Sequence, residues 1–149
     1  MTALSDPQAD RKAWMSLLAK AAPQRLADLL PDPPESAFLR PPEVGSVMVR
    51  GRVGGTGAPF NLGEVTVTRC SLQLPCGTVG HAWVQGRDKG HATRAAAVDA
   101  LMQTARAAEM QAQVLTPLAA EAGTARARRA TKAAATRVEF FTMVRGEDQ

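Results

Sequence analysis

Two cysteines and two histidines are the side chains in this sequence that could together bind a transition metal. Cys70 and Cys76 are separated by five residues, and His81 and His91 are separated by nine. Zinc ligands usually come in pairs with shorter spacings, so this pattern does not match a zinc site. With no third histidine and no carboxylates clustered beside these residues, we expect no metal ligand set. The lack of nearby histidines and carboxylates also argues against a Cys–His nucleophile. We therefore expect no catalytic residue in this chain.

The glycine-rich stretch "GRVGGTG", residues 51–57, is a candidate for phosphate binding because bare backbone can approach a phosphate closely. A phosphate loop needs a Gly-Lys-Ser/Thr sequence, and no lysine lies nearby. A dinucleotide loop that starts at Gly55 would need a glycine where Phe60 stands. Both loops also need a following helix, whereas a strand pattern follows here. We therefore interpret the stretch as a hairpin turn, which leaves its backbone accessible to a partner or ligand.

The stretch "GRDKGH" is the densest polar cluster, with Arg87, Asp88, Lys89 and His91 at the expected start of a helix. Cations are unfavourable beside the positive end of a helix dipole, so an anion or a partner carboxylate would compensate them. These four residues are our candidate anion or partner contact. In the alternative interpretation, Asp88 caps the helix and the two cations point into water.

The C-terminal segment, residues 124–146, is predicted to be a basic, alanine-rich helix that ends in an apolar tail. Its residues to Arg137 include five cations and no carboxylate. Small and apolar residues occupy the opposite half of the helix and continue into the tail: Ala127, Ala130, Ala134, Val138, Phe140, Phe141 and Met143. We expect these residues to form a subunit interface, with Phe141 as an anchor in a partner pocket. The alternative is that the helix docks on its own sheet, and the basic face is either solvated or meets an acidic partner.

The elements that position these residues follow an α+β order. Helical periodicity predicts N-terminal helices over residues 10–21 and 23–30, preceded by a flexible N-terminus at 1–9. Five prolines between Pro31 and Pro42 predict an irregular connector at 31–43. Period-two patterns then predict an antiparallel sheet of three or more strands, around residues 47–53, 64–74 and 79–85. C-terminal helices follow, with a break at Gly123, and the whole chain of 149 residues is expected to be one domain.

The composition predicts a thin core and therefore a partner. Alanine occurs 28 times, whereas aromatic residues are only 4% of the chain, and alanine removes little apolar area from water. The formal charge is +4, and the segment from Glu121 to Arg137 alone accounts for it. No apolar run is long enough to span a bilayer, and the N-terminus lacks the apolar core of a signal peptide. Two cysteines are too few for a disulfide scaffold, so we expect a soluble cytoplasmic protein.

Four stretches of the sequence together resemble one protein family. They are "RKAWMSLLA" (Arg11–Ala19), "GGTGAPFNLGEVTVTR" (Gly54–Arg69), "WVQGRDKGHATRAAAVDALMQ" (Trp83–Gln103) and "RVEFFTMVRG" (Arg137–Gly146). In this order and with this spacing, the chain resembles the G subunit (PhnG) family of the bacterial carbon–phosphorus lyase core complex.

The resemblance implies an accessory role in phosphonate catabolism. Members of the family work in a cytoplasmic assembly with the H, I and J subunits, which we expect to hold several copies. The first reaction displaces adenine from a purine nucleoside triphosphate with an alkylphosphonate and forms a ribose 1-phosphonate 5-triphosphate. The resemblance assigns the nucleosidase chemistry to the I subunit, and the radical step, with its iron–sulfur cluster and S-adenosylmethionine, to the J subunit. It thus implies a non-autonomous transferase subunit without a cofactor, catalytic residue or metal of its own.

The alternative function is that of a small nucleic-acid-binding protein, which would use the basic helix at residues 124–137. Basic helices bind phosphate backbones electrostatically. However, no aromatic stacking pattern accompanies the cations of this helix, so we rank this function second.

Overall fold

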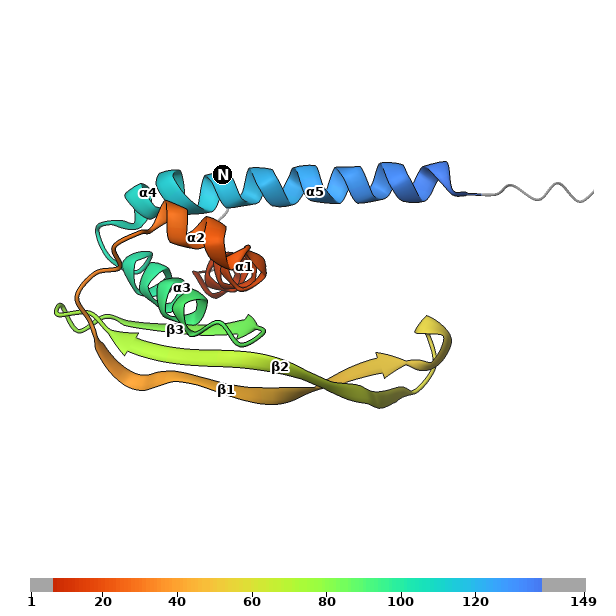
Figure 1. Cartoon of the computed structure of the whole chain (residues 1–149), viewed down its shortest axis with the longest axis horizontal. Helices are drawn as coiled ribbons and strands as arrows, with labels where there is room; N and C mark the ends of the chain where they lie inside the picture. The colour runs from red at the N-terminus through yellow and green to blue at the C-terminus, as the bar shows by residue number, and fades with distance from the viewer. Residues whose placement is uncertain (1–6, 138–149) are drawn as a thin grey trace, which may run out of the picture.

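The computed structural model of the chain describes residues 7–137, and its element order is α+β, as predicted (Figure 1). The N-terminal helices are α1 (Pro7–Lys20) and α2 (Pro23–Leu29). The strands are β1 (Ala37–Arg52), β2 (Pro59–Gln73) and β3 (Val79–Gln85). The remaining helices are α3 (Lys89–Leu101), α4 (Ala107–Met110) and α5 (Thr116–Ala135), with a π-helical turn at Gln111–Leu115 between the last two. No helix within 7–137 has the length and apolarity to cross a membrane.

The three strands form an antiparallel meander in the order β1-β2-β3, which confirms the predicted sheet. The helices α1, α2 and α3 lie on one side of this sheet, and α3 is nearest to it (Figure 1). The hairpin turn predicted for "GRVGGTG" lies between β1 and β2, where Val53–Gly55 form a short 3₁₀ turn, although Gly51 and Arg52 still belong to β1. Gly54 and Gly55 adopt positive φ angles of 60° and 83° there, which glycine does without strain.

The core is built around α3 and is rich in small side chains. From Ala95 to Leu101 every residue of this helix is buried, because the sheet covers one side and α1, α2 and α4 cover the others. Larger buried side chains pack around it, among them Leu18, Leu26, Leu72, Val84 and Met110. The prediction of a thin, alanine-rich core with few aromatic residues agrees with this arrangement.

The structure differs from the predicted irregular connector at 31–43, because β1 begins at Ala37 and runs through the prolines. Pro41 and Pro42 are tolerated because they lie in a bulge of an edge strand, where they oppose only Cys70 between the pairs Arg40–Ser71 and Glu43–Arg69. A proline in such a bulge does not have to donate a ladder hydrogen bond. The irregular segment is therefore shorter and ends at Ser36.

Two helix boundaries also differ from the predictions. The helix α1 begins at Pro7, so residues 7–9 of the predicted flexible N-terminus are helical. The predicted break at Gly123 is absent, because α5 continues from Thr116 to Ala135 without interruption. A glycine inside a helix costs only about 0.5–1 kcal/mol relative to alanine, and the flanking alanines, the best helix formers, offset that cost.

Two extensions leave the body of the molecule (Figure 1). The strand β3 pairs only with residues 67–73 of β2, so residues 46–66 of β1 and β2 form a two-stranded ribbon, which we call the hairpin arm. The helix α5 contacts the body through its N-terminal half. Residues 122–137, which we call the helical arm, comprise the rest of α5 and the two residues after it, and all of them are exposed. Both arms project in the same direction from the body.

At Gly80 the sheet and α3 approach each other closely. A Cβ atom at this position of β3 would lie 2.7 Å from the Ala100 nitrogen and 2.8 Å from its Cβ, and it would also collide with the Ala96 carbonyl oxygen. A side chain here would therefore push α3 off the sheet.

We predict that Gly80→Ala lowers the free energy of unfolding by about 1–3 kcal/mol, the usual cost of overpacking a core. Urea unfolding of the full-length chain, followed by circular dichroism, measures this difference. Gly63→Ala is the matched control in the same sheet, because a Cβ there meets no atom within 4 Å. Equal unfolding midpoints for the two variants would contradict the prediction.

Candidate functional site

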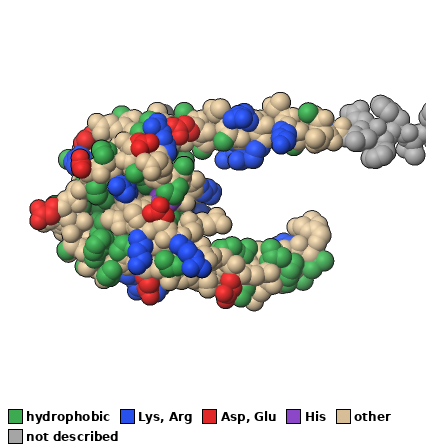
Figure 2. All heavy atoms as spheres, viewed as in Figure 1, with side chains coloured by type: hydrophobic (Ala, Val, Ile, Leu, Met, Phe, Trp, Pro, Cys, Tyr) green, Lys and Arg blue, Asp and Glu red, His purple; other side chains and the backbone are tan. Residues whose placement is uncertain are grey.

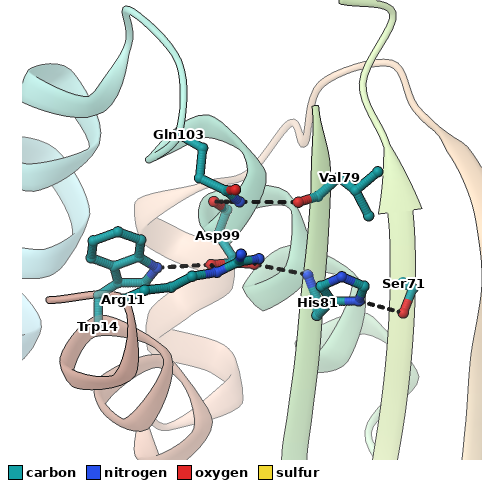
Figure 3. A network of polar contacts seen from close by, with 7 residues as sticks. All are labelled: Arg11, Trp14, Ser71, Val79, His81, Asp99 and Gln103. Carbon is teal, nitrogen blue, oxygen red and sulfur yellow. Dashed lines mark hydrogen bonds and ion pairs between the residues drawn. The ribbon is translucent and has the colours of Figure 1, made fainter. Parts of the chain in front are cut away.

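The most densely bonded side chain in the described part of the chain is Asp99, which is fully buried on α3 (Figure 3). Arg11 donates from Nε to Oδ1 at 3.1 Å and from Nη2 to Oδ2 at 2.7 Å. The Trp14 indole donates to Oδ1 at 2.9 Å, and the backbone N–H of His81 donates to Oδ2 at 2.9 Å. One carboxylate thus connects α1, α3 and the free edge of β3.

This cluster is structural rather than catalytic. A buried carboxylate is stable when a cation and several hydrogen-bond donors surround it, and here both oxygens accept two hydrogen bonds each. Gln103 closes the same edge by donating to the carbonyl oxygens of Val79 and Asp99 at 3.0 and 2.9 Å. The carboxylate has no free face toward a substrate, and we infer that its role is to lock α1 and β3 onto α3.

Sequence reasoning did not identify Asp99, although one signal was present. It is the only charged residue in the run from Ala95 to Met102, where every other side chain is apolar. A lone carboxylate inside such a run must find donors if the run is buried. Arg11 and Trp14 lie one turn apart on α1, which is the spacing that brings two donors to one acceptor.

The histidines and cysteines lie in separate environments. The His81 ring is exposed, with Nδ1 at 2.8 Å from Ser71 Oγ. The His91 ring is buried, and its Nε2 donates to the Leu18 carbonyl oxygen at 2.8 Å. Cys70 is buried, which raises the pKa of its thiol, whereas Cys76 is exposed in the turn before β3. Within residues 7–137, no group of three potential ligands is close enough to hold a metal ion.

The four residues of "GRDKGH" do not converge on one site. Asp88 is the N-cap of α3, and its Oδ1 accepts a hydrogen bond from the His91 backbone N–H at 2.8 Å, as the capping alternative predicted. The His91 ring points into the core, away from solvent. Arg87 and Lys89 are exposed. The structure therefore leaves two solvent-facing cations here, and the candidate contact role of Arg87 and Lys89 stays a prediction.

The predicted interface residues on the last helix are exposed. Ala127, Ala130 and Ala134 lie on the helical arm, beyond the part of α5 that packs on α1. Docking of this arm on its own sheet, the alternative considered above, does not occur within the described residues. Val138, Phe140, Phe141 and Met143 lie outside the described residues, so their interface role stays a prediction.

The hairpin arm is a second exposed surface, which sequence reasoning did not identify. None of its residues is buried, although it carries large apolar side chains. Met48, Phe60 and Leu62 are 50%, 42% and 67% exposed, respectively. Single exposed apolar residues are ordinary on a protein surface, but a ribbon without any buried residue has no core to support it. We therefore take the two arms as candidate surfaces for contact with another protein.

We predict that Asp99→Ala lowers the free energy of unfolding by about 2–4 kcal/mol. Removal of one partner of a buried ion pair usually costs about 3–5 kcal/mol, and we expect somewhat less because the Arg11 side chain is 33% exposed and can recruit water. Denaturant unfolding of the full chain measures the loss. Glu43→Ala breaks the exposed pair with Arg69 and is the control, with an expected change of about 0–1 kcal/mol. A loss for Asp99→Ala no larger than for the control would refute the locking role.

Comparison with known proteins identifies relatives over nearly the whole chain. The sequence profile of the family described as "Phosphonate metabolism protein PhnG" matches residues 9–146. A protein of Rhizobium meliloti (strain 1021), named "Alpha-D-ribose 1-methylphosphonate 5-triphosphate synthase subunit PhnG", is 48% identical over 143 residues. That match covers 94% of this chain and 92% of the relative. The resemblance inferred from the four stretches is confirmed: this chain belongs to the PhnG family of phosphonate metabolism proteins.

Proposed function

We propose that this chain is an accessory subunit of a synthase that makes alpha-D-ribose 1-methylphosphonate 5-triphosphate in phosphonate catabolism. The observation that carries the proposal is the 48% identity to a named subunit of that synthase, over nearly the full length of both chains. A subunit acts within an assembly, and the two uncovered arms supply surfaces for one. The proposed partners are the H, I and J subunits of the carbon–phosphorus lyase core complex, in the cytoplasm and in several copies per assembly.

The proposed reaction transfers a ribosyl group. An oxygen of the alkylphosphonate forms a bond to C1′ of the nucleoside triphosphate while the bond from C1′ to N9 of adenine breaks. Adenine leaves with the electron pair of that bond, and its N9 takes up the proton that the phosphonate gives up. The triphosphate remains on the 5′ carbon. The proposed role of this chain is to support that reaction by assembly, with the bond-making groups on another subunit. The Asp99 cluster is saturated with donors, and the described histidines each have a structural partner, which supports this division of labour.

Assembly gives the first test. We expect the full-length chain, co-expressed with the H, I and J subunits of the same organism, to be retained by a tag on the I subunit. A chain truncated after Ala135 lacks the apolar tail, and we expect its retention to fall because the proposed anchors are missing. Light scattering of the purified material gives the mass of the assembly. A full-length chain that runs as a monomer and binds none of the three subunits would refute the proposal.

Activity gives the second test. We expect the pure chain to release no adenine from ATP in the presence of methylphosphonate, because the reacting groups lie on another subunit. The complete assembly should release adenine, and omission of this chain should abolish the coupled formation of the ribose 1-phosphonate product. Chromatography of adenine and phosphorus NMR of the product measure the two outcomes. Adenine release by the pure chain, free of other subunits, would show that it is an autonomous enzyme.

A further inference from the structure

The helical arm concentrates positive charge that nothing in the described structure neutralises. From residue 122 to residue 137 the chain has five cations and no carboxylate. All five are exposed, and none makes an ion pair or side-chain hydrogen bond with any residue in the range 7–137. The cations are Arg126, Arg128, Arg129, Lys132 and Arg137. The nearest carboxylate along the helix, Glu121, already pairs with Arg25 at 2.7 Å.

This arrangement weakens the arm when it stands alone. Arg128 and Lys132 are four residues apart and therefore lie on the same face of the helix, where like charges repel. The arm also extends past the body, so tertiary packing does not support it, and short helices without packing are marginal in water. Carboxylates from another molecule would remove the repulsion and stabilise the helix.

The hairpin arm exposes apolar side chains, which an apolar surface of another molecule would bury. A two-stranded ribbon is marginally stable by itself, and this one exposes Met48, Val53, Phe60 and Leu62. Figure 2 shows the two arms on the same side of the molecule, with an open hollow between them. The two arms border this hollow in that view.

The positive charge of the helical arm and the apolar surface of the hairpin arm together decide which kind of molecule fits the hollow. A second copy of this chain has the same excess of positive charge, and its helical arm would repel the first. A nucleic acid would neutralise the helical arm but would leave the apolar hairpin arm uncovered. A protein element with acidic residues on one side and apolar residues on the other satisfies both arms.

We infer that the two arms clasp a single element of a partner protein, with its acidic side against the helical arm and its apolar side against the hairpin arm. This inference rests on the proposed function, because it assumes that the chain works inside an assembly. It adds the chemistry of the surface that the partner must present.

Charge reversal tests the helical arm within the complete assembly. Arg128→Glu/Lys132→Glu and the control Lys12→Glu/Lys20→Glu both replace two exposed cations by carboxylates, so they change the net charge equally. Glutamate keeps a helical propensity close to that of arginine and lysine, and circular dichroism verifies the fold. We expect the arm variant to lose retention by the tagged assembly by at least about tenfold, and the control to be retained like the wild type.

The outcomes separate this inference from the proposed function. If the wild-type chain is not retained, the proposed function fails and the clasp fails with it. If the wild type is retained and the two charge-reversal variants behave alike, the clasp alone is refuted. Salt-sensitive binding of a single-stranded DNA oligonucleotide by the wild type, lost in Arg128→Glu/Lys132→Glu, with no effect of that variant on assembly, would assign the arm to nucleic acid instead.

The hairpin arm has its own matched pair of variants. Phe60→Ser/Leu62→Ser changes the arm, whereas Phe38→Ser/Leu39→Ser removes the same two side-chain types from the base of β1, where both are also exposed. We expect only the arm variant to weaken retention. Equal losses in both variants would refute a specific role of the arm.

A zero-length carbodiimide cross-linker tests the acidic contact directly, because it joins an amine to a carboxylate. Lys132 is the single lysine of the helical arm, and the chain has three others, Lys12, Lys20 and Lys89. In the intact assembly we expect Lys132 to be joined to an aspartate or glutamate of another subunit. An intact assembly in which Lys132 is joined to no other subunit would refute the clasp.

Discussion

The fold depends on the burial of one carboxylate. Asp99 has no contact with water, so its charge must be balanced inside the protein, and the donors that balance it come from α1 and from the edge of β3. Hydrogen bonds are directional, whereas contacts between alanine side chains are not, and alanine is the commonest residue of the helix that carries Asp99. The carboxylate therefore fixes where α1 lies relative to α3. It also occupies a backbone N–H group at the free edge of β3, which protects that edge from pairing with another strand.

The small side chains of α3 have a second consequence. Alanines and Gly80 let the helix lie very close to the sheet, so the core is tight but small. A core of this size covers one end of the sheet. The rest of β1 and β2 has no helix packed against it. Within residues 7–137, the large apolar side chains that are exposed lie on the strands or in the turn between β1 and β2. Such exposed surfaces agree with the proposed role as a subunit of an assembly.

Much of this architecture could be predicted from the sequence, because it depends on local patterns. Helical periodicity predicted α1 and α2, and the capping role of Asp88 was the alternative interpretation of "GRDKGH". The prediction was wrong at the prolines of β1. A proline in a bulge of an edge strand does not have to donate a ladder hydrogen bond, so the strand can contain it. Contacts between distant residues were not predictable: nothing near Asp99 in sequence indicates that Arg11 and Trp14 bind it. The hairpin arm was missed for a similar reason, since its exposure depends on where β3 ends rather than on the residues of β1 and β2.

The contact between α1 and Asp99 also affects how the chain is made. Arg11 is 88 residues from its acceptor. A ribosome that adds about 5–20 residues per second needs roughly 4–18 s to cover that distance. During this interval α1 has been synthesised, but the carboxylate that holds it does not yet exist. The helix α1 is therefore made early but fixed in place late, because its apolar face cannot pack until α3 has been synthesised.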